Sequence, residues 1–333
     1  MSNFHVAEGK NMKYLKRDAK KFARENMRGI WSASTYGFKK NLELDEKGIV
    51  SDLRHFIDVL KIDGFYMGGI INQFWALTVE ERKRAQELLI READGAVQTV
   101  SMCGHTCIET SIELIRHAEK AGADFACLIN PFYAASTPEL IENYYRTIAA
   151  SVDIGILILN SPTSGYVMSP PLVEKVAQID NIVAIKNVGG IEHTNEVRRR
   201  VGDLIVVSDP SEDNWLLNLT YYGQQVFLAS PAVHLYQWEG HLPMKTYTDL
   251  AMRGNLEEAK EIFASMQPLR DMAKRWIWDP WHHGNLPFAR LNYWQKLMGL
   301  AGGYVRPPLR EMNEEEKLAF RQDFERVEIA VGA

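Results

Sequence analysis

The chain has 333 residues, of which 46% are hydrophobic and 24% are charged, values close to the average of folded proteins. This composition excludes a disordered chain, a collagen-like chain and a disulfide-rich scaffold. The formal net charge of −5 gives no long-range attraction to phosphate backbones or anionic lipids, so we expect neither a nucleic-acid partner nor a membrane partner. The three cysteines are an odd number that cannot pair completely, which indicates a reducing compartment and predicts a cytoplasmic protein.

The first segment of the chain, residues 1–28, is rich in lysine and arginine and is predicted to form an N-terminal basic helical arm. Apolar residues recur through it at loosely helical intervals, namely Phe4, Met12, Leu15, Phe22 and Met27. We expect a helix that packs on a partner subunit, and the alternative is a solvated extension.

Short apolar runs alternate with amphipathic segments through residues 29–250. The runs typical of buried parallel strands are 29–33, 64–68, 97–103, 124–130, 154–160, 181–186, 204–208 and 225–230. The segments with helical spacing include 78–92, 108–121, 138–150 and 172–179. Repeated strand and helix units of about 20 to 36 residues predict a (β/α)8 TIM barrel over residues 29–250. A doubly wound open sheet is the competitor, but no G-x-G-x-x-G follows the first run.

The last part of the chain shows helical patterns alone. Residues 255–277, 286–300 and 313–329 are the expected helices, and Gly302-Gly303 and Pro307-Pro308 separate the last two. We therefore predict a C-terminal helical domain over residues 251–333.

Lys186 stands out because it ends the apolar run 182–185, where a charged side chain is unfavourable in a packed core. A lysine at the end of a buried strand loses hydration, which disfavours its ammonium form and lowers its pKa. The neutral amine can condense with a ketone or aldehyde to a Schiff base, whose protonated nitrogen acts as an electron sink for C–C or C–O cleavage. In the alternative interpretation, the amine only extends into solvent at the barrel rim.

Several segments of the chain resemble the dihydrodipicolinate synthase and N-acetylneuraminate lyase family. The resemblance runs from Gly29 nearly to the end and rests on the order and spacing of its motifs, which are Leu77-Thr78-x-Glu80-Glu81-Arg82, Ala121-Gly122-Ala123-Asp124, Asn130-Pro131-Phe132-Tyr133, Asn160-x-Pro162, the run 181–186, and Gly299-Leu300-x-Gly302-Gly303-x-Val305-Arg306-Pro307-Pro308-Leu309. It places Lys186 on the family's Schiff-base lysine. It also implies a (β/α)8 barrel with a C-terminal helical domain, a homo-oligomer (tetramer or dimer), and action on pyruvate or other 2-oxo acids without a metal or organic cofactor.

The chain departs from the family where the family writes Gly-Thr-Thr-Gly-Glu, because it has Gly69-Ile70-Ile71-Asn72-Gln73. In the family those threonines orient the substrate carboxylate and pass a proton. Isoleucine side chains do neither, although the backbone N–H groups of Ile70 and Ile71 can still hold a carboxylate. We keep Gly69, Ile70, Ile71 and Asn72 as predicted substrate-binding residues.

The family's Tyr-Asn-x-Pro motif reads Leu159-Asn160-Ser161-Pro162, so the tyrosine that exchanges protons with the substrate is missing. The arginine expected soon after is also missing, and Thr163-Ser164-Gly165 occupies its place. These departures argue against dihydrodipicolinate synthesis itself. Leu159, Asn160 and Ser164, together with Ser208 at the end of the run 204–208, complete the predicted substrate-binding set.

Each carbinolamine and enamine step needs a general acid or base, which contributes roughly 10²- to 10⁴-fold. Tyr133 and His105 are the candidates. Tyr133 falls where the family has a tyrosine that reaches into a neighbouring subunit's site, and His105 follows the third strand and has a suitable intrinsic pKa. Their alternative roles are those of a packing phenol and a hydrogen-bonded loop histidine.

The spacing of Cys103, His105 and Cys107 does not predict a zinc site, because no second ligand pair follows at the usual separation. The two cysteines are interpreted as small apolar fillers.

The sequence thus predicts a Schiff-base lyase that acts on a small-molecule carbonyl substrate, a 2-oxo acid of the pyruvate type. The two isoleucines and Phe74-Trp75 favour an aromatic or apolar substituent, as in an aldolase or hydratase-aldolase. One alternative is a 2-keto-3-deoxy sugar acid dehydratase of the same family, because Thr163-Ser164-Gly165 also resembles such members. The other is a barrel without turnover that acts as a binding or regulatory protein.

Overall fold

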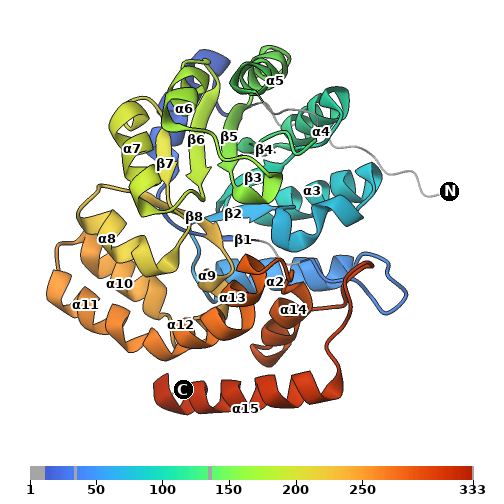
Figure 1. Ribbon diagram of the computed structural model, residues 1–333, viewed down its shortest axis with the longest axis vertical. Helices are drawn as coiled ribbons and strands as arrows, with labels where there is room; N and C mark the ends of the chain where they lie inside the picture. Colours follow the sequence, from blue (N-terminus) through green and yellow to red (C-terminus); the bar gives the residue numbers. More distant parts are fainter. Residues whose placement is uncertain (1–11, 34–35, 134–136, 332–333) are drawn as a thin grey trace.

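The computed structural model describes residues 12–33, 36–133 and 137–331 of the chain. Eight parallel strands form a ring at the centre of the molecule, with helices around it (Figure 1). Their bounds are β1 Gly29–Ala33, β2 Gly64–Met67, β3 Gln98–Met102, β4 Phe125–Ile129, β5 Gly155–Asn160, β6 Ile182–Asn187, β7 Val206–Ser208 and β8 Val226–Ser230. The predicted (β/α)8 TIM barrel is confirmed.

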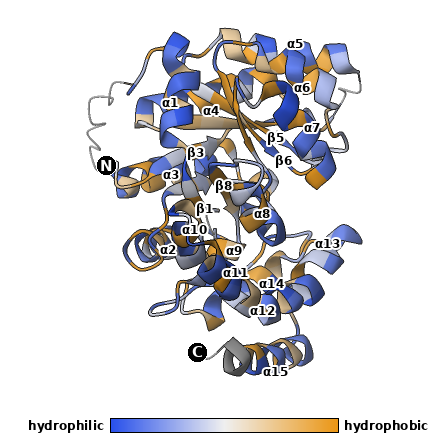
Figure 2. Cartoon of the chain, turned by 90° about the vertical axis from the view of Figure 1, so that its left-hand side faces the viewer, coloured by the Kyte–Doolittle hydropathy of each residue, from blue (hydrophilic) through white to orange (hydrophobic). Residues whose placement is uncertain are grey.

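The strands alternate with helices that carry apolar residues on one side. In Figure 2 strands β5 and β6 are mostly orange, whereas the helices around them mix orange and blue. The helices of the outer ring are α2 Glu46–Asp58, α3 Val79–Ala93, α4 Ile108–Ala121, α5 Pro138–Ala150, α6 Pro170–Ala177, α7 Ile191–Val201 and α8 Trp215–Thr220. Their starts follow local capping chemistry: Thr78 and Glu81 form a reciprocal capping box at α3, and the Thr137 hydroxyl accepts from the N–H of Leu140 at α5.

The ladder of strands runs β7-β6-β5-β4-β3-β2-β1-β8, so side chains close the seam between β7 and β8. The Ser208 hydroxyl donates to the Val226 carbonyl at 3.0 Å and accepts from the Leu228 N–H at 3.0 Å. The Gln224 amide adds bonds to the carbonyls of Asp209 and Val226 at 3.0 and 2.9 Å. These bonds replace the missing ladder and keep the barrel closed.

Helices alone follow the barrel, as predicted. They are α9 Ala232–Leu235, α10 Pro243–Met252, α11 Leu256–Ser265, α12 Gln267–Ala273, α13 Asp279–His282, α14 Phe288–Leu297 and α15 Glu314–Val331, with a π-helical stretch at Lys274–Trp278. A buried ion pair fixes them to the barrel, because Arg270 of α12 donates to both carboxylate oxygens of Glu212, after β7, at 2.6 and 2.9 Å. None of the helices in the described part of the chain is long and apolar enough to cross a membrane.

The expectation that the basic arm packs on a partner subunit is wrong for its described part, which caps the chain's own barrel. Ala19, Ala23 and Met27, from α1 (Ala19–Asn26) and the residue after it, are buried in the same apolar cluster as the residues that fill the barrel. Phe4 lies outside the described residues. The arm sits at the N-terminal ends of the strands, where the Tyr14 hydroxyl donates to the Asp124 carbonyl at 2.6 Å and accepts from the Gly155 N–H at 2.9 Å.

The basic residues of the arm bind the C-terminal ends of three successive barrel helices. Lys16 donates to the carbonyls of Ala149 and Val152 at the end of α5, Lys20 to that of Ala177 in α6, and Arg24 to that of Gly202 after α7. Carbonyls at helix C-termini lack intrahelical partners and carry partial negative charge. The four-residue spacing of these cations therefore matches the arrangement of the helices around the barrel.

We predict that Tyr14→Phe destabilises the protein by about 1 to 3 kcal/mol, because the partly buried Asp124 carbonyl and Gly155 N–H both lose their partner. Urea unfolding of the two proteins measures the difference. Tyr221→Phe, at a tyrosine that is 75% exposed, is the matched control and should change stability by less than about 0.5 kcal/mol. Equal stability of Tyr14→Phe and the control would contradict this role of the arm.

Candidate active site

Lys186 lies near the C-terminal end of β6, the end at which barrels of this architecture carry their sites. It pairs in register with Leu159 of β5 on one side and with Ser208 of β7 on the other. Partners in a parallel ladder point to the same face, so all three side chains face the barrel interior. Lys186 is partly buried there.

Within the described part of the chain, the amine of Lys186 contacts a backbone carbonyl and an aromatic ring. Its Nζ donates a hydrogen bond to the carbonyl of Ala229 in β8, and it lies 5.2 Å from the centre of the Tyr66 ring of β2. Ala229 falls at a bulge, because Trp31 pairs with Leu228 and Ser32 already pairs with Ser230. It has φ of +57°, a left-handed conformation that is unusual for alanine.

Burial lowers the pKa of Lys186 to about 8, and the nearby Cys127 thiol opposes that shift only in part. The ordinary lysine value is about 10.4. A pKa of about 8 leaves part of the amine neutral near neutral pH, and the neutral amine is the nucleophilic form. The sequence-based expectation of a lowered pKa at this position agrees with the geometry.

The turn after β2 holds the predicted residues Gly69, Ile70, Ile71 and Asn72. The Asn72 side chain accepts from the Gly69 N–H at 2.9 Å, and the Asn72 N–H donates to the Gly69 carbonyl at 3.1 Å. These two bonds fix the turn without using the N–H groups of Ile70 or Ile71. Both isoleucine side chains pack against the apolar cluster inside the barrel. The turn therefore brings apolar side chains and two backbone donors to the barrel mouth.

Asn160 points to the opposite face of β5 from Leu159, because side chains alternate along a strand. It belongs to a ladder of buried amides outside the barrel, accepting from Asn130 at 2.8 Å and donating to Asn187 at 2.8 Å. It also accepts from the N–H of Met168 at 2.8 Å and donates to its carbonyl at 3.3 Å. The structure thus places Asn160 away from Lys186 and uses its amide in holding the ends of β4, β5 and β6.

Two predicted serines have their hydroxyls engaged within the chain. Ser208 faces the amine, but its hydroxyl bonds the backbone of β8, as described above. Ser164 is buried in a short 3-10 turn, Pro162–Ser164, and its hydroxyl bonds the carbonyls of Ser161 and Tyr166 at 2.9 and 3.0 Å. This geometry favours a structural role for both hydroxyls.

Tyr133 and His105 lie in loops at the barrel mouth, after β4 and β3. Tyr133 is 81% exposed in the single chain. The His105 Nδ1 accepts from the Cys107 N–H at 3.0 Å, and burial, with a smaller contribution from Arg82, lowers the pKa of His105. No contact between the described residues joins either side chain to Lys186.

The two loop cysteines have different environments. Cys103 is buried and bonds the Ser101 carbonyl, as expected of a filler, whereas Cys107 is exposed beside Glu109, so the interpretation of Cys107 as a filler is wrong. Within the described ranges, no three His, Cys, Asp or Glu side chains gather as metal ligands.

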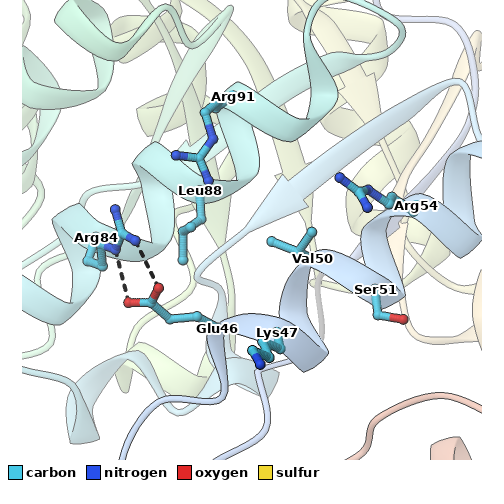
Figure 3. A pocket seen from close by; sticks show the side chains of 8 residues that line it. All are labelled: Glu46, Lys47, Val50, Ser51, Arg54, Arg84, Leu88 and Arg91. Atoms are coloured by element: carbon cyan, nitrogen blue, oxygen red, sulfur yellow. Dashed lines mark hydrogen bonds and ion pairs between the residues drawn. The ribbon is translucent and has the colours of Figure 1, made fainter. Parts of the chain in front are cut away.

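A groove of about 390 Å³ opens on the outside of the barrel, between α2 and α3 (Figure 3). Arg84 and Glu46 form a two-pronged ion pair across it, at 2.9 and 2.8 Å. Its lining residues are Glu46, Lys47, Val50, Ser51, Arg54, Arg84, Leu88 and Arg91. All of them come from the two helices and none from the barrel interior, so the groove is separate from the Lys186 site.

Two neighbours of the amine, Tyr66 and Ala229, were not predicted from the sequence. The sequence distinguishes Tyr66 only weakly. It carries a phenol in an otherwise apolar run, at a strand position whose side chain faces the barrel interior. The sequence does not distinguish Ala229 at all. This residue contacts the amine through its backbone carbonyl, which a bulge turns inward, and an alanine side chain does not predict a bulge.

The model of the dihydrodipicolinate synthetase family matches residues 26–327. The chain is 28% identical to N-acetylneuraminate lyase of Clostridium perfringens over 291 residues, 87% of this chain and 96% of the lyase. It is 27% identical to 4-hydroxy-tetrahydrodipicolinate synthase of Archaeoglobus fulgidus over 307 residues, 90% of this chain and 98% of that protein. Its fold matches the crystal structure of YagE, a prophage protein of the dihydrodipicolinic acid synthase family from E. coli K12 in complex with pyruvate, with a TM-score of 0.79, 21% identity and coverage of 90% and 98%.

We predict that Lys186→Met stabilises the protein at pH 7, by about 1 to 2 kcal/mol, because the folded chain no longer holds a poorly hydrated ammonium. Between the folded pKa of about 8 and the ordinary value, the unfolded chain binds more protons, so wild-type stability rises with pH. The advantage of Lys186→Met should therefore shrink at pH 10.

Urea unfolding at pH 7 and pH 10 measures both differences. Lys175→Met, at an exposed lysine of α6, is the control and should change stability little at either pH. A variant at Lys186 that is less stable than wild type at pH 7 would show that the buried amine is not a cost to the fold.

Proposed function

Because the chain belongs to the dihydrodipicolinate synthetase family, as the match over residues 26–327 shows, we propose that it is a lyase that forms a Schiff base between Lys186 and a 2-oxo acid of the pyruvate type. The family makes the chain a class I, Schiff-base aldolase or lyase. The observation that carries the role of Lys186 is the amine inside the barrel mouth, with its pKa lowered to about 8 by burial.

The proposed reaction begins when the neutral amine of Lys186 attacks the carbonyl carbon of the substrate. The carbinolamine loses water to give the imine, and the protonated imine accepts the electron pair of the breaking bond beside it. In an aldol cleavage that bond is C–C, an aldehyde leaves, and the resulting enamine is protonated on carbon to return the imine. In a dehydration that bond is C–H: a base takes the proton, and the enamine then expels the hydroxyl group of the next carbon, which leaves as water with the C–O electron pair. Hydrolysis of the imine returns the amine and the 2-oxo acid.

The turn after β2 is the proposed site of the substrate carboxylate. The N–H groups of Ile70 and Ile71 lie on the turn that begins at the edge of the Tyr66 ring, and the same ring lies 5.2 Å from the amine. Two backbone donors can hold one carboxylate in place of the missing threonine hydroxyls. Proton transfer is proposed for Tyr133 and His105, because Leu159 brings no phenol to the strand beside Lys186.

The walls near the amine favour a substrate with an apolar or aromatic substituent. Leu159 pairs with Lys186, and Ile70 and Ile71 cover the mouth from β2. Aliphatic walls gain little from sugar hydroxyls, whose hydration is lost without replacement. The 2-keto-3-deoxy sugar acid dehydratase is the weaker alternative, because the Ser164 hydroxyl, part of the motif that suggested it, is engaged in its own turn.

A homo-oligomer, tetramer or dimer, is proposed from the aromatic surface at the mouth. Trp75, Phe132 and Tyr133 are 41%, 38% and 81% exposed in the single chain. Phe74 joins them through edge contacts with Trp75 and Phe132 at 5.6 and 6.2 Å between ring centres. Adjacent exposed aromatic side chains are typical of a surface that another protein covers.

We expect wild-type protein incubated with pyruvate and borohydride to gain the mass of one reduced pyruvate adduct per chain. Lys186→Ala should lose the adduct, and Lys175→Ala, at the exposed lysine of α6, should keep it. Mass spectrometry of the intact chain and of its peptides gives the readout. If no adduct forms with pyruvate or with any of a panel of 2-oxo acids and aromatic aldehydes, the barrel is a binding or regulatory protein.

We expect subunit mixing to reveal the role of Tyr133. If Tyr133 serves a neighbouring subunit's site, Tyr133→Phe and Lys186→Ala each lose most activity, and oligomers reassembled from both recover part of it. The measurement is turnover of an aryl-substituted 2-oxo acid before and after mixing. No recovery in oligomers shown to contain both chains would limit Tyr133 to packing.

A further inference from the structure

Tyr66 lies between the two parts of the proposed site. The Lys186 Nζ is 5.2 Å from the centre of its ring. A Cβ at Gly69 would approach the Tyr66 Cε1 to 2.3 Å, so the turn after β2 lies against the edge of the ring and a larger residue there would displace the ring. One side chain therefore contacts both the amine and the turn.

The Tyr66 ring is fixed inside the barrel. Its side chain is buried, and its hydroxyl donates toward the sulfurs of Met102 and Cys127, at 3.4 and 3.5 Å. Sulfur is a weak acceptor, so these contacts orient the ring without supplying charge to the site. Burial strongly raises the pKa of the phenol, so the hydroxyl stays protonated.

Few charged or titratable groups face the Lys186 amine. Among the described residues they are Tyr66 from β2 and Cys127 from β4, while Leu159, Ser208 and the Ala229 carbonyl face it from β5, β7 and β8. No carboxylate in the described chain contributes to the shift in the pKa of this amine. The face of an aromatic ring carries negative potential that attracts an ammonium group, more strongly where water is excluded.

We infer that Tyr66 is a positioning residue of the imine site, holding the Lys186 ammonium over its ring and supporting the turn at residues 69–72 with the edge of the ring. This inference rests on the proposed function for its catalytic meaning. The face of the ring carries the effect on the amine, and its bulk carries the effect on the turn. The hydroxyl only anchors the ring.

The proton affinity of the amine is measured without any imine, by the pH dependence of Lys186 acetylation with trace acetic anhydride, read by mass spectrometry. Tyr66→Leu fills most of the space but removes the ring, so the midpoint should fall by about half to one pH unit. Tyr66→Phe should leave the midpoint within about 0.2 units. Phe125→Leu, which removes another aromatic ring of the barrel interior, beside Tyr14 and Phe22, is the control and should not move it.

The second readout is the pyruvate concentration needed for half-maximal borohydride trapping. It should rise several-fold in Tyr66→Leu, because the turn loses its support, and stay unchanged in Tyr66→Phe and Phe125→Leu. Circular dichroism confirms that each variant is folded. An unchanged acetylation midpoint in folded Tyr66→Leu, or an equal shift in Tyr66→Phe, would overturn the inference. If the wild type forms no adduct but the midpoints move as expected, the proposed function fails and the contact between ring and amine stands.

Discussion

The site depends on a single constraint, the cost of keeping an ammonium group inside a barrel of apolar side chains. An unpaired buried charge is expensive, and the usual remedy is a carboxylate partner. Lys186 instead has one backbone carbonyl and one aromatic ring. Burial lowers the pKa of the amine to about 8, and the Cys127 thiol opposes that shift only in part. A carboxylate in place of the carbonyl or the ring would stabilise the charged form and remove the nucleophile.

The barrel supplies this environment because its closure brings distant strands to one point. Lys186 comes from β6, Tyr66 from β2 and the Ala229 carbonyl from β8, and an open sheet would separate them. Polar side chains hold the closure. Outside the interior, Asn130, Asn160 and Asn187 connect the ends of β4 to β6, and inside it Ser208 joins β7 to β8. Rigid strand ends let a partly solvated amine keep one orientation.

The sequence predicted the order of the strands and, to within two residues, their bounds, because buried parallel strands leave continuous apolar runs and barrel helices leave amphipathic ones. It placed Lys186 near the C-terminal end of a buried strand, as the structure does, because a charge at the end of an apolar run is conspicuous. It did not separate Leu159 from Asn160, which face opposite sides of β5, since a strand buried on both faces has no polar alternation to read. The docking of the arm was also hidden, because the carbonyls that its lysines bind have no signature in the sequence.

The interior around the amine leaves few protons to transfer. The Tyr66 hydroxyl is directed at sulfur, the Ser208 hydroxyl at the backbone of β8, and β5 offers only Leu159. An imine mechanism still needs an acid and a base at each step. In the proposed mechanism they come from the loops at the mouth, where Tyr133 and His105 lie, or from water admitted there. The closed interior then sets the reactivity of the amine and favours the proposed apolar substrate, while the loops supply the protons. Because the amine and the proton donors then lie in different parts of the barrel, the isoleucines and Leu159 can replace polar residues while the lysine is retained.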